Sequence, residues 1–512
     1  MNMKKRYITA AAAVLLALVS PALFAQESFG GFDSASLGGD DSFGGDGFGG
    51  FADDAFGGGG FGFAGGSALT IGGKASFEAR AILGGDAYKD YFDIDEAGDG
   101  IYLFPNLSLD IGYSGGLAEL SGTLQFDEAS IRDYPEDILE ELTLRLYAGN
   151  FVIEGGKMKL VWGKGDKLHV VDNFNANDYT DFIIPDYIDR RIAEPMFRVA
   201  WNGPAGLRLE GVYAPMMTAD RSAASGIWAP GSLGSITAVT GEVLGAQADI
   251  ALQNNDAVAL LAAAAKADSL LPATSSFDYG QAGLRVTHTL GPVDLGASYY
   301  YGHYKQPTAD LSGYLAAKAS GNPAALASDT ALPSLHYDRL QVFGLEAAAA
   351  AGRFNLRGEA AYYLTDDTNG DDPWVRNNSF NWVAGFDVDL PVHNINLNIQ
   401  NQGSWIMNHD KIGSGAVPEQ YDTDYRSHGK ATSNRISFLV SDTFLRDKLE
   451  LSCNFIWGIE GKEFLLLPKL DWNITDGLNL IVSGMYINSN TDGEFYDYRD
   501  NSFVQIGMSY KF

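Results

Sequence analysis

Cysteine is nearly absent from this sequence of 512 residues. The single cysteine, Cys453, cannot form an internal disulfide, and a zinc site built from several thiolates is excluded. Positive charge is also scarce, since 35 lysine and arginine residues stand against 65 aspartate and glutamate residues, for a formal net charge of −30. A protein that follows nucleic-acid phosphates needs the opposite balance, so we exclude nucleic-acid binding.

The sequence also lacks the motifs of common enzymes. Its seven histidines are scattered and form no His-Glu-x-x-His motif. There is no phosphate-binding loop, and no Gly-x-Ser-x-Gly elbow lies between a strand and a helix. We therefore expect no enzymatic activity, no catalytic residues, no cofactor and no metal site.

Long apolar runs are missing beyond residue 25. The longest, Ala257–Ala265, has nine residues, whereas a membrane-spanning helix needs about 20. Only helices and closed barrels satisfy every backbone hydrogen bond in lipid. The rest of the chain is therefore either a soluble protein outside the cytoplasm or a membrane β-barrel.

Residues 1–25 have the three parts of an export signal. Residues 4–6 are basic, residues 7–19 are apolar except for one threonine, and the segment ends in small residues at Ala25. This pattern predicts a signal peptide that is removed between Ala25 and Gln26. Removal of the three positive charges changes the net charge from −30 to −33.

Residues 26–66 are rich in glycine and phenylalanine, as in Phe-Gly-Gly-Phe at 29–32, and they carry seven acidic and no basic residues. Ordering so much glycine costs more entropy than the segment can recover, so we expect a flexible segment. A solvated leader is one interpretation, and binding of a partner through the phenylalanines is another.

From residue 67 to the end, short segments alternate apolar and polar residues. The last of them is the clearest: Val504, Ile506, Met508, Tyr510 and Phe512 alternate with Gln505, Gly507, Ser509 and Lys511. In a β-strand these two sets lie on opposite faces. Residues 354–363, 394–400 and 449–460 show the same pattern, and a tilted strand of about 9–11 residues crosses a bilayer.

Sixteen weaker segments begin near Leu69, Ile101, Ala118, Leu139, Phe151, Phe197, Leu207, Val243, Val258, Tyr279, Val293, Leu340, Phe380, Ile436, Phe464 and Leu478. The sequence therefore predicts an all-β fold over residues 67–512, a single transmembrane antiparallel β-barrel of 16–20 strands with 18 favoured. The Ala-rich segments 257–265 and 347–351 suit helices by propensity. We count them as strands because their neighbours alternate.

The connections between these segments fall into two classes. Some are tight turns rich in glycine and asparagine, at 114–116, 149–150, 202–204 and 476–477. Others are long and polar, at 84–100, 163–195, 216–241, 306–337, 366–378, 408–433 and 488–501. Short turns at one end and long loops at the other are typical of bacterial outer-membrane barrels.

The chain ends in an amphipathic segment with Tyr510 and a terminal Phe512. This end resembles the C-terminal assembly signal of outer-membrane proteins from diderm bacteria, which implies that the barrel-assembly machinery reads Tyr510 and Phe512. Residues 155–201 resemble a strand and loop in a group of poorly characterised porin-like barrels. The resemblance implies an outer-membrane location, contact with lipid and exposure at the cell surface.

The loop at 163–195 is the candidate pore constriction. It is dense in polar and charged residues but also carries Phe174, Tyr179 and Phe182. A loop with that much apolar surface either folds inward and narrows the lumen, or lies outward on the rim. The candidate constriction residues are Lys164, Asp166, His169, Asp172, Asp178, Asp186, Asp189, Arg190 and Arg191.

These features predict an outer-membrane porin that admits small polar solutes or ions by passive or substrate-selective diffusion. The acidic excess would favour cations in a narrow path. One alternative is a structural or adhesive barrel whose long loops bind external ligands, and another is an uptake channel for hydrophobic ligands. The sequence leaves open the solute and whether the barrel forms a homo-oligomer.

Overall fold

The structure, a computed structural model, describes residues 61–62, 68–83, 100–230, 233–267, 270–412, 430–491 and 493–512. The proposed cleavage site at Ala25 and Gln26 lies outside the described residues, and so do residues 26–60 of the glycine-rich segment. No helix among the described residues is long and apolar enough to cross a bilayer.

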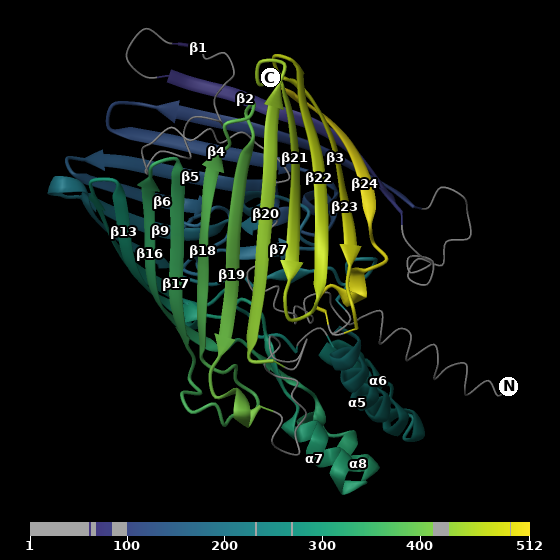
Figure 1. The fold of residues 1–512 in the computed structure, drawn as a ribbon. Helices are drawn as coiled ribbons and strands as arrows, with labels where there is room; N and C mark the ends of the chain where they lie inside the picture. Colours follow the sequence, from purple (N-terminus) through teal and green to yellow (C-terminus); the bar gives the residue numbers. More distant parts are fainter. Residues whose placement is uncertain are drawn as a thin grey trace.

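Eighteen antiparallel strands form a closed barrel (Figure 1). Each strand pairs with the next along the chain, and β24 pairs with β2 from Lys74↔Lys511 to Ile82↔Phe503, which closes the ring. The strands are β2 (Ala68–Ile82), β3 (Ile101–Ser114), β4 (Ala118–Phe126), β5 (Leu139–Ala148), β6 (Phe151–Met158), β9 (Glu194–Asn202), β10 (Leu207–Ala214), β12 (Gln281–Leu290), β13 (Val293–His303), β16 (Arg339–Ala351), β17 (Phe354–Leu364), β18 (Ser379–Asp389), β19 (Asn396–Ile406), β20 (Thr432–Phe444), β21 (Leu449–Gly458), β22 (Glu463–Thr475), β23 (Leu478–Asn488) and β24 (Phe503–Lys511). The predicted barrel of 18 strands is confirmed.

Two of the twenty predicted strands are wrong. The segments that begin near Val243 and Val258 lie in α5 (Leu233–Gln253) and α6 (Ala257–Ala267). Alanine and leucine favour helix here, and the Asp256 side chain accepts a hydrogen bond from Ala259 N at 3.0 Å at the start of α6. The segment 347–351, equally rich in alanine, is a strand because it pairs with β13 on one side and β17 on the other.

The remaining strands and α-helices are short and are not strands of the barrel wall. They are β1 (Phe61–Gly62), β7 (Ala176–Tyr179), β8 (Arg191–Ile192), β11 (Arg221–Ser222), β14 (Thr308–Asp310), β15 (Ser334–His336), α3 (Glu128–Arg132), α4 (Tyr187–Arg190), α7 (Ser312–Ser320) and α8 (Pro323–Leu326). β1 falls in the segment expected to be flexible and pairs with the start of β2.

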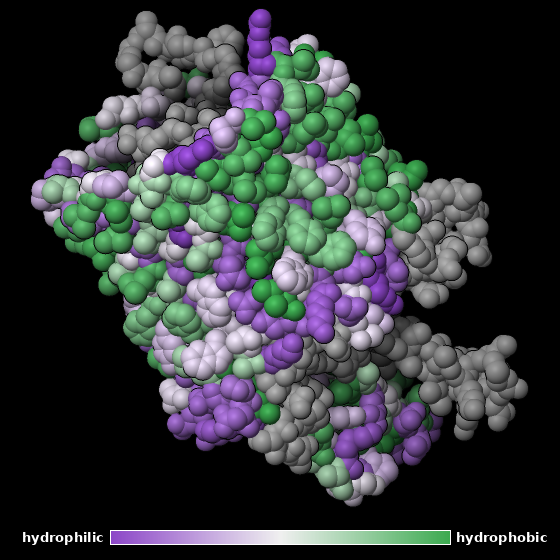
Figure 2. Space-filling view, viewed as in Figure 1, coloured by the Kyte–Doolittle hydropathy of each residue, from purple (hydrophilic) through white to green (hydrophobic). Residues whose placement is uncertain are grey.

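Alternation along the strands places apolar side chains outside and polar side chains inside. In β24, Ile506, Met508 and Tyr510 are half exposed on the outer face, whereas Gln505 and Ser509 are buried on the inner face. Figure 2 shows hydrophobic side chains over much of the strand surface on one side, with hydrophilic side chains gathered toward the long loops. Such an outer surface suits a hydrocarbon environment.

The two ends of the barrel differ in the length of their connections. The predicted turns at 114–116, 149–150, 202–204 and 476–477 all join consecutive strands, and they lie at the same end as the C-terminus (upper end in Figure 1). Helices α5, α6, α7 and α8 project from the opposite end, where the long connections lie.

Candidate functional site: a segment inside the barrel

Residues 159–193, called here the inner segment, leave the wall after β6 and pack inside the barrel. Trp162 and Phe174 are fully buried, with ring centroids 5.1 Å apart, and Phe174 contacts Tyr300 of β13 at 5.1 Å. Trp162 Nε1 donates a hydrogen bond to Glu210 of β10 at 2.6 Å. Gly283 of β12 makes room for this packing, because a Cβ there would lie 2.7 Å from both aromatic rings. The aromatics of the predicted loop therefore cover the inner wall.

Glu359 of β17 holds the start of the inner segment. Its Oε1 atom accepts hydrogen bonds from Lys164 N at 2.7 Å and Gly165 N at 2.6 Å, and it lies 2.8 Å from His169 Nδ1. Its Oε2 atom accepts a hydrogen bond from Val170 N at 2.8 Å. One buried carboxylate thus satisfies several donors of a turn that has left the barrel wall.

The far end of the inner segment docks on another part of the wall. The Asp181 carboxylate pairs with both terminal nitrogens of Arg80 on β2, at 2.5 and 2.8 Å. Phe182 stacks on Trp228 at a centroid distance of 4.9 Å and also contacts Tyr498 at 4.7 Å. Other members of this apolar cluster face inward from β21 to β24: Ile456, Leu465, Leu467, Met485, Ile487 and Phe503.

These two anchors lie on nearly opposite walls. In ring order from β2 to β24, β2 is first and β17 is eleventh of eighteen. A segment that touches Arg80 on β2 and Glu359 on β17 must cross the lumen. Of the two placements left open by the sequence, the structure has the inward one.

Buried polar contacts hold the inner segment together. The Asn175 side chain accepts a hydrogen bond from Leu160 N at 2.7 Å and donates to the carbonyl oxygens of Met158 and Ile192 at 3.0 and 2.9 Å. Asp172, Tyr187 and Arg191 form a second buried cluster. Because the side chains of Asn175, Asp172, Tyr187 and Arg191 each have at least one partner, the inner segment can stay folded inside a polar lumen.

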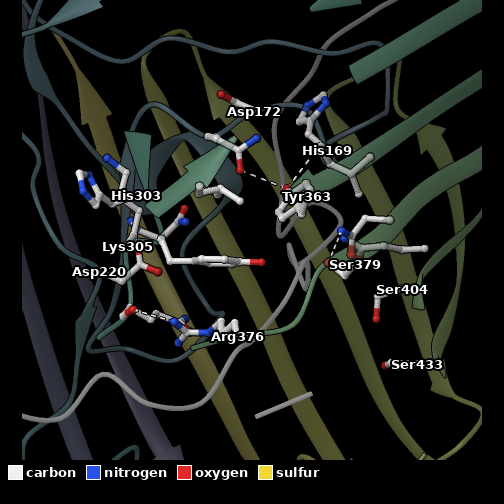
Figure 3. Close-up of a pocket in the computed structure, with 18 of the residues that line it drawn as sticks. His169, Asp172, Asp220, His303, Lys305, Tyr363, Arg376, Ser379, Ser404 and Ser433 are labelled. Carbon is white, nitrogen blue, oxygen red and sulfur yellow. Dashed lines mark hydrogen bonds between the residues drawn. The ribbon is translucent and has the colours of Figure 1, made fainter. Parts of the chain in front are cut away.

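A cavity of about 200 Å³ lies between the inner segment and the barrel wall. Its walls come from the inner segment, from the connections after β10, β13 and β17, and from β19 and β20. Figure 3 shows His303, Lys305, Asp220 and Arg376 on one side of the cavity. On the other side stand three hydroxyl groups, those of Ser379, Ser404 and Ser433.

Charged groups at this cavity are perturbed by burial. Burial raises the pKa of Asp220 to about 6, even though its carboxylate accepts a hydrogen bond from Asn177 N at 2.8 Å. Burial also lowers the pKa of Lys305, against the opposing effect of Glu194, whose Oε1 atom lies 3.3 Å from Lys305 Nζ. Asp220 is thus a group in the cavity whose charge changes near pH 6.

Three of the nine predicted constriction residues line this cavity, namely His169, Asp172 and Arg191. The others have separate positions. Lys164 and Asp166 bind the wall, since Lys164 Nζ lies 3.7 Å from Asp294 and Asp166 Oδ2 lies 3.2 Å from Arg357 Nη1.

The remaining four lie further along the inner segment. Asp186 caps α4 and pairs with Lys167 at 3.1 Å. Asp178 accepts hydrogen bonds from Thr180. Asp189 is exposed within the barrel, whereas Arg190 is buried.

Sequence reasoning did not identify the groups outside the loop that complete the site. Arg80 and Glu359 are charged residues on the inner faces of alternating strands. The alternation predicts that they face the lumen, but it does not predict which residues they contact. Asp220, Lys305 and Arg376 come from three other connections, and no pattern in the sequence links them.

Paired charges line the wall from β4 to β10. Arg145 lies 3.3 Å from Glu119 and 2.7 Å from Glu154, and Arg198 lies 2.7 Å from Glu154 and 2.6 Å from Glu210. Opposite charges on neighbouring strands stabilise each other. This part of the inner wall is polar and carries charges of both signs.

Several solved structures resemble this chain. A BenF-like porin from Pseudomonas fluorescens is similar over 87% of this chain and 98% of its own, with 9% identity and a TM-score of 0.45. The outer membrane channel DcaP of Acinetobacter baumannii is similar over 88% and 99%, with 11% identity and a TM-score of 0.39. A mutant of the porin of Rh. blastica is similar over 87% and 100%, with 10% identity and a TM-score of 0.35.

No curated protein matches the chain in sequence. A family does, over residues 155–512, which include the inner segment and every strand from β9 to β24. This match spans more than half of the 512 residues. The chain therefore belongs to the family described as protein of unknown function, DUF1302.

Proposed function

We propose that this protein is an outer-membrane porin that lets small polar solutes diffuse along a path narrowed by the inner segment. The observation that carries the proposal is a polar cavity beside a segment that crosses the lumen of a closed barrel. An apolar outer surface supports a place in lipid, and inward polar side chains support a wet interior. Selectivity then depends on the size and charge of the narrowed path.

In this proposal the nine constriction residues have two tasks. His169, Asp172 and Arg191 line the cavity and set the charge along its wall. Lys164 and Asp166 hold the inner segment to the wall and so set the width of the path. The remaining four, Asp178, Asp186, Asp189 and Arg190, shape the inner segment or its local charge.

A preference for cations is part of the proposal. The acidic excess over the whole chain and the exposed Asp189 support it, because a narrow negative path concentrates cations. The cavity also contains Arg376 and Lys305, but each has an acidic partner, at 3.2 and 3.3 Å. Because each pair is neutral as a whole, Arg376 and Lys305 do not offset the acidic excess of the chain.

Planar bilayer recordings on the purified mature protein test both parts. We expect steady ohmic steps of single-channel current, and in a salt gradient a reversal potential with the sign of cation permeation. Sealed membranes would contradict the channel, and a reversal potential of the opposite sign would contradict the cation preference alone.

A surface-binding barrel is the second candidate. Helices α5 and α6 project beyond the barrel end, and Val258 and Leu261 of α6 are 77% and 72% exposed. Exposed apolar side chains of this kind suit contact with an external ligand. A barrel that does not conduct, yet binds a surface ligand that a variant without residues 233–267 does not bind, would favour this candidate.

Export and assembly complete the proposal. Residues 1–25 would direct export and be removed after Ala25, and the barrel-assembly machinery would read Tyr510 and Phe512. Both side chains are half exposed on the outer surface, and their rings stack at 6.5 Å. N-terminal sequencing of protein recovered from the membrane tests the cleavage site, because the mature chain should begin at Gln26.

A further inference from the structure

A row of aromatic side chains crosses the outer surface of the barrel near its long connections. Its members are successive register partners on β13, β16, β17, β18 and β19, namely Tyr299, Phe343, Tyr362, Phe380 and Trp405. Phe343 and Trp405 are 48% and 45% exposed. Aromatic girdles of this kind lie where the hydrocarbon meets the lipid headgroups. The row therefore marks the membrane interface at the end of the barrel that carries the long connections.

Arg339 lies beyond this row, on the outer face of β16. Leu340 and Val342 are buried inside the barrel, whereas Phe343 and Leu345 are exposed, so the odd-numbered positions of β16 point outward. Arg339 is four residues from Phe343, which is about 13 Å along a strand and roughly 10 Å along the membrane normal at a tilt of about 40°. This distance places its guanidinium at the level of the headgroups.

Arg339 is also the one fixed charge on this part of the outer surface. The outward positions of β13 and β16–β19, strands that the structure describes in full, contain no aspartate, glutamate or lysine and no second arginine. A charged side chain is costly on a wall that faces lipid, and least costly near the interface. The position of Arg339 thus suits a side chain that meets the membrane surface.

No carboxylate of the described residues neutralises this guanidinium. Arg339 Nη1 donates a hydrogen bond of 2.6 Å to the hydroxyl oxygen of Tyr301, and the guanidinium carbon lies 5.2 Å from the centre of that ring. The exposed Asp278 acts on Tyr279 together with Arg339 but forms no ion pair with Arg339. On the inner wall, in contrast, Arg80 and Arg145 each pair with a carboxylate.

A lipid phosphate matches this arginine in charge and in place. Guanidinium groups bind phosphates through paired, charge-assisted hydrogen bonds. The guanidinium faces the lipid side of the wall and stands next to the aromatic row. An anion anchored in the membrane therefore meets it together with an apolar surface for its acyl chains, which a free anion cannot use.

We propose that Arg339 and the aromatic row bind the phosphorylated headgroup of a lipid in the outer leaflet of the membrane. The phosphate bonds to the guanidinium, Tyr301 orients that guanidinium, and the acyl chains lie along the outward side chains of β16 and β17. The inference goes beyond the proposed function, because lipid binding needs a folded barrel and no current. Its failure is therefore separate from a failure of the channel.

Native mass spectrometry of the detergent-solubilised barrel tests the site by counting bound lipids at increasing lipid concentration. The probes are bisphosphorylated lipid A and an uncharged glycolipid, digalactosyldiacylglycerol. We expect lipid A to bind at least about tenfold more tightly than the uncharged glycolipid. Arg339→Gln should weaken lipid A binding about tenfold, the range for hydrogen bonds to a charged group. Arg339→Lys keeps the charge and should lose less than Arg339→Gln.

Arg353→Gln is the matched control, since Arg353 is exposed in the turn between β16 and β17 at the opposite end of the same hairpin. It should bind lipid A as the unchanged protein does. Equal binding of the two lipids, unchanged binding in Arg339→Gln, or an equal loss in Arg353→Gln would overturn the site. Displacement of lipid A by an equal concentration of inorganic phosphate would also overturn it, because the ligand would then be a free anion.

Discussion

The Oε1 atom of Glu359 accepts a hydrogen bond of 2.6 Å from the backbone nitrogen of Gly165, which ties β17 to a segment that leaves the wall at β6. The same carboxylate accepts from the backbone nitrogens of Lys164 and Val170. Three backbone donors on one buried carboxylate, with His169 Nδ1 2.8 Å away, make Glu359 a polar anchor of the inner segment.

Replacing the anchor should loosen the inner segment without opening the barrel. Glu359→Ala leaves the backbone donors of Lys164, Gly165 and Val170 unmatched, at a local cost of about 3 kcal/mol or more. We expect single-channel conductance to rise roughly twofold or more, with larger current noise, since constriction size controls what passes. Glu119→Ala is the control, because Glu119 also faces the lumen but contacts Arg145 and Tyr147 rather than the inner segment. An unchanged conductance in Glu359→Ala would contradict an anchoring role.

A glycine beside the anchor should be equally sensitive. Gly163 has a φ of +125°, and a Cβ there would lie 2.2 Å from Glu359 Oε1. Gly163→Ala should therefore push the carboxylate away and reproduce the conductance increase of Glu359→Ala. Gly116→Ala provides the comparison, since a Cβ at Gly116 meets nothing within 4 Å. If both alanine variants conduct as the unchanged protein does, the close approach of Gly163 to Glu359 is not needed.

The barrel could be predicted from the sequence because its signal is local. In β24 the side chains that face out and in alternate along nine consecutive residues, so a single strand reports its own two faces. The same rule failed for α5 and α6. The alanine run of α6 carries no alternation, and residues with intrinsic helix preference decided the outcome there.

The site could be predicted only in part. The aromatics of the inner segment indicated that it packs against something, but their partners lie far away in sequence. Leu465 and Leu467 are apolar residues on the inner face of β22, and they are buried in the same cluster as Phe182 and Trp228. Contacts between distant connections leave no local pattern, so Arg80, Asp220 and Arg376 could not be assigned beforehand.

The stacked pair Phe182 and Trp228 should hold the connection after β10 inside the barrel. Trp228→Ala removes a ring that is 7% exposed, at a cost of about 3–5 kcal/mol. We expect the connection around residues 215–230 to become sensitive to protease added to the folded barrel, while the strands stay protected. Trp405→Ala should not have this effect, because Trp405 is 45% exposed on the outer surface. Equal protection of both variants would show that the stack does not fix this connection.

The ion preference should depend on pH through Asp220. Its pKa is about 6 because burial opposes ionisation, so raising the pH from 5 to 7 removes a proton and adds one negative charge to the cavity. The reversal potential in a salt gradient should shift toward greater cation preference over this interval. Asp220→Asn should reduce the shift, since an amide does not titrate. A shift of the same size in Asp220→Asn would mean that other groups cause the pH dependence.

The contact between Gly73 and Phe512 allows barrel closure to be tested separately from recognition during assembly. The two residues exchange backbone hydrogen bonds of 3.0 and 2.9 Å, and a Cβ on Gly73 would lie 2.7 Å from the Phe512 ring and 2.6 Å from Ser108 O. Gly73→Ala should therefore slow refolding into detergent micelles severalfold, because it disturbs the seam where β2 meets β3 and the C-terminus. Phe512→Ala keeps the backbone contacts and should refold at the normal rate, yet reach the outer membrane of cells in smaller amounts. Val504→Ala, on the outer face of the same strand, is the control for both measurements. Normal membrane levels of Phe512→Ala would contradict the assembly signal, and slow refolding of that variant would assign the ring to the stability of the seam instead.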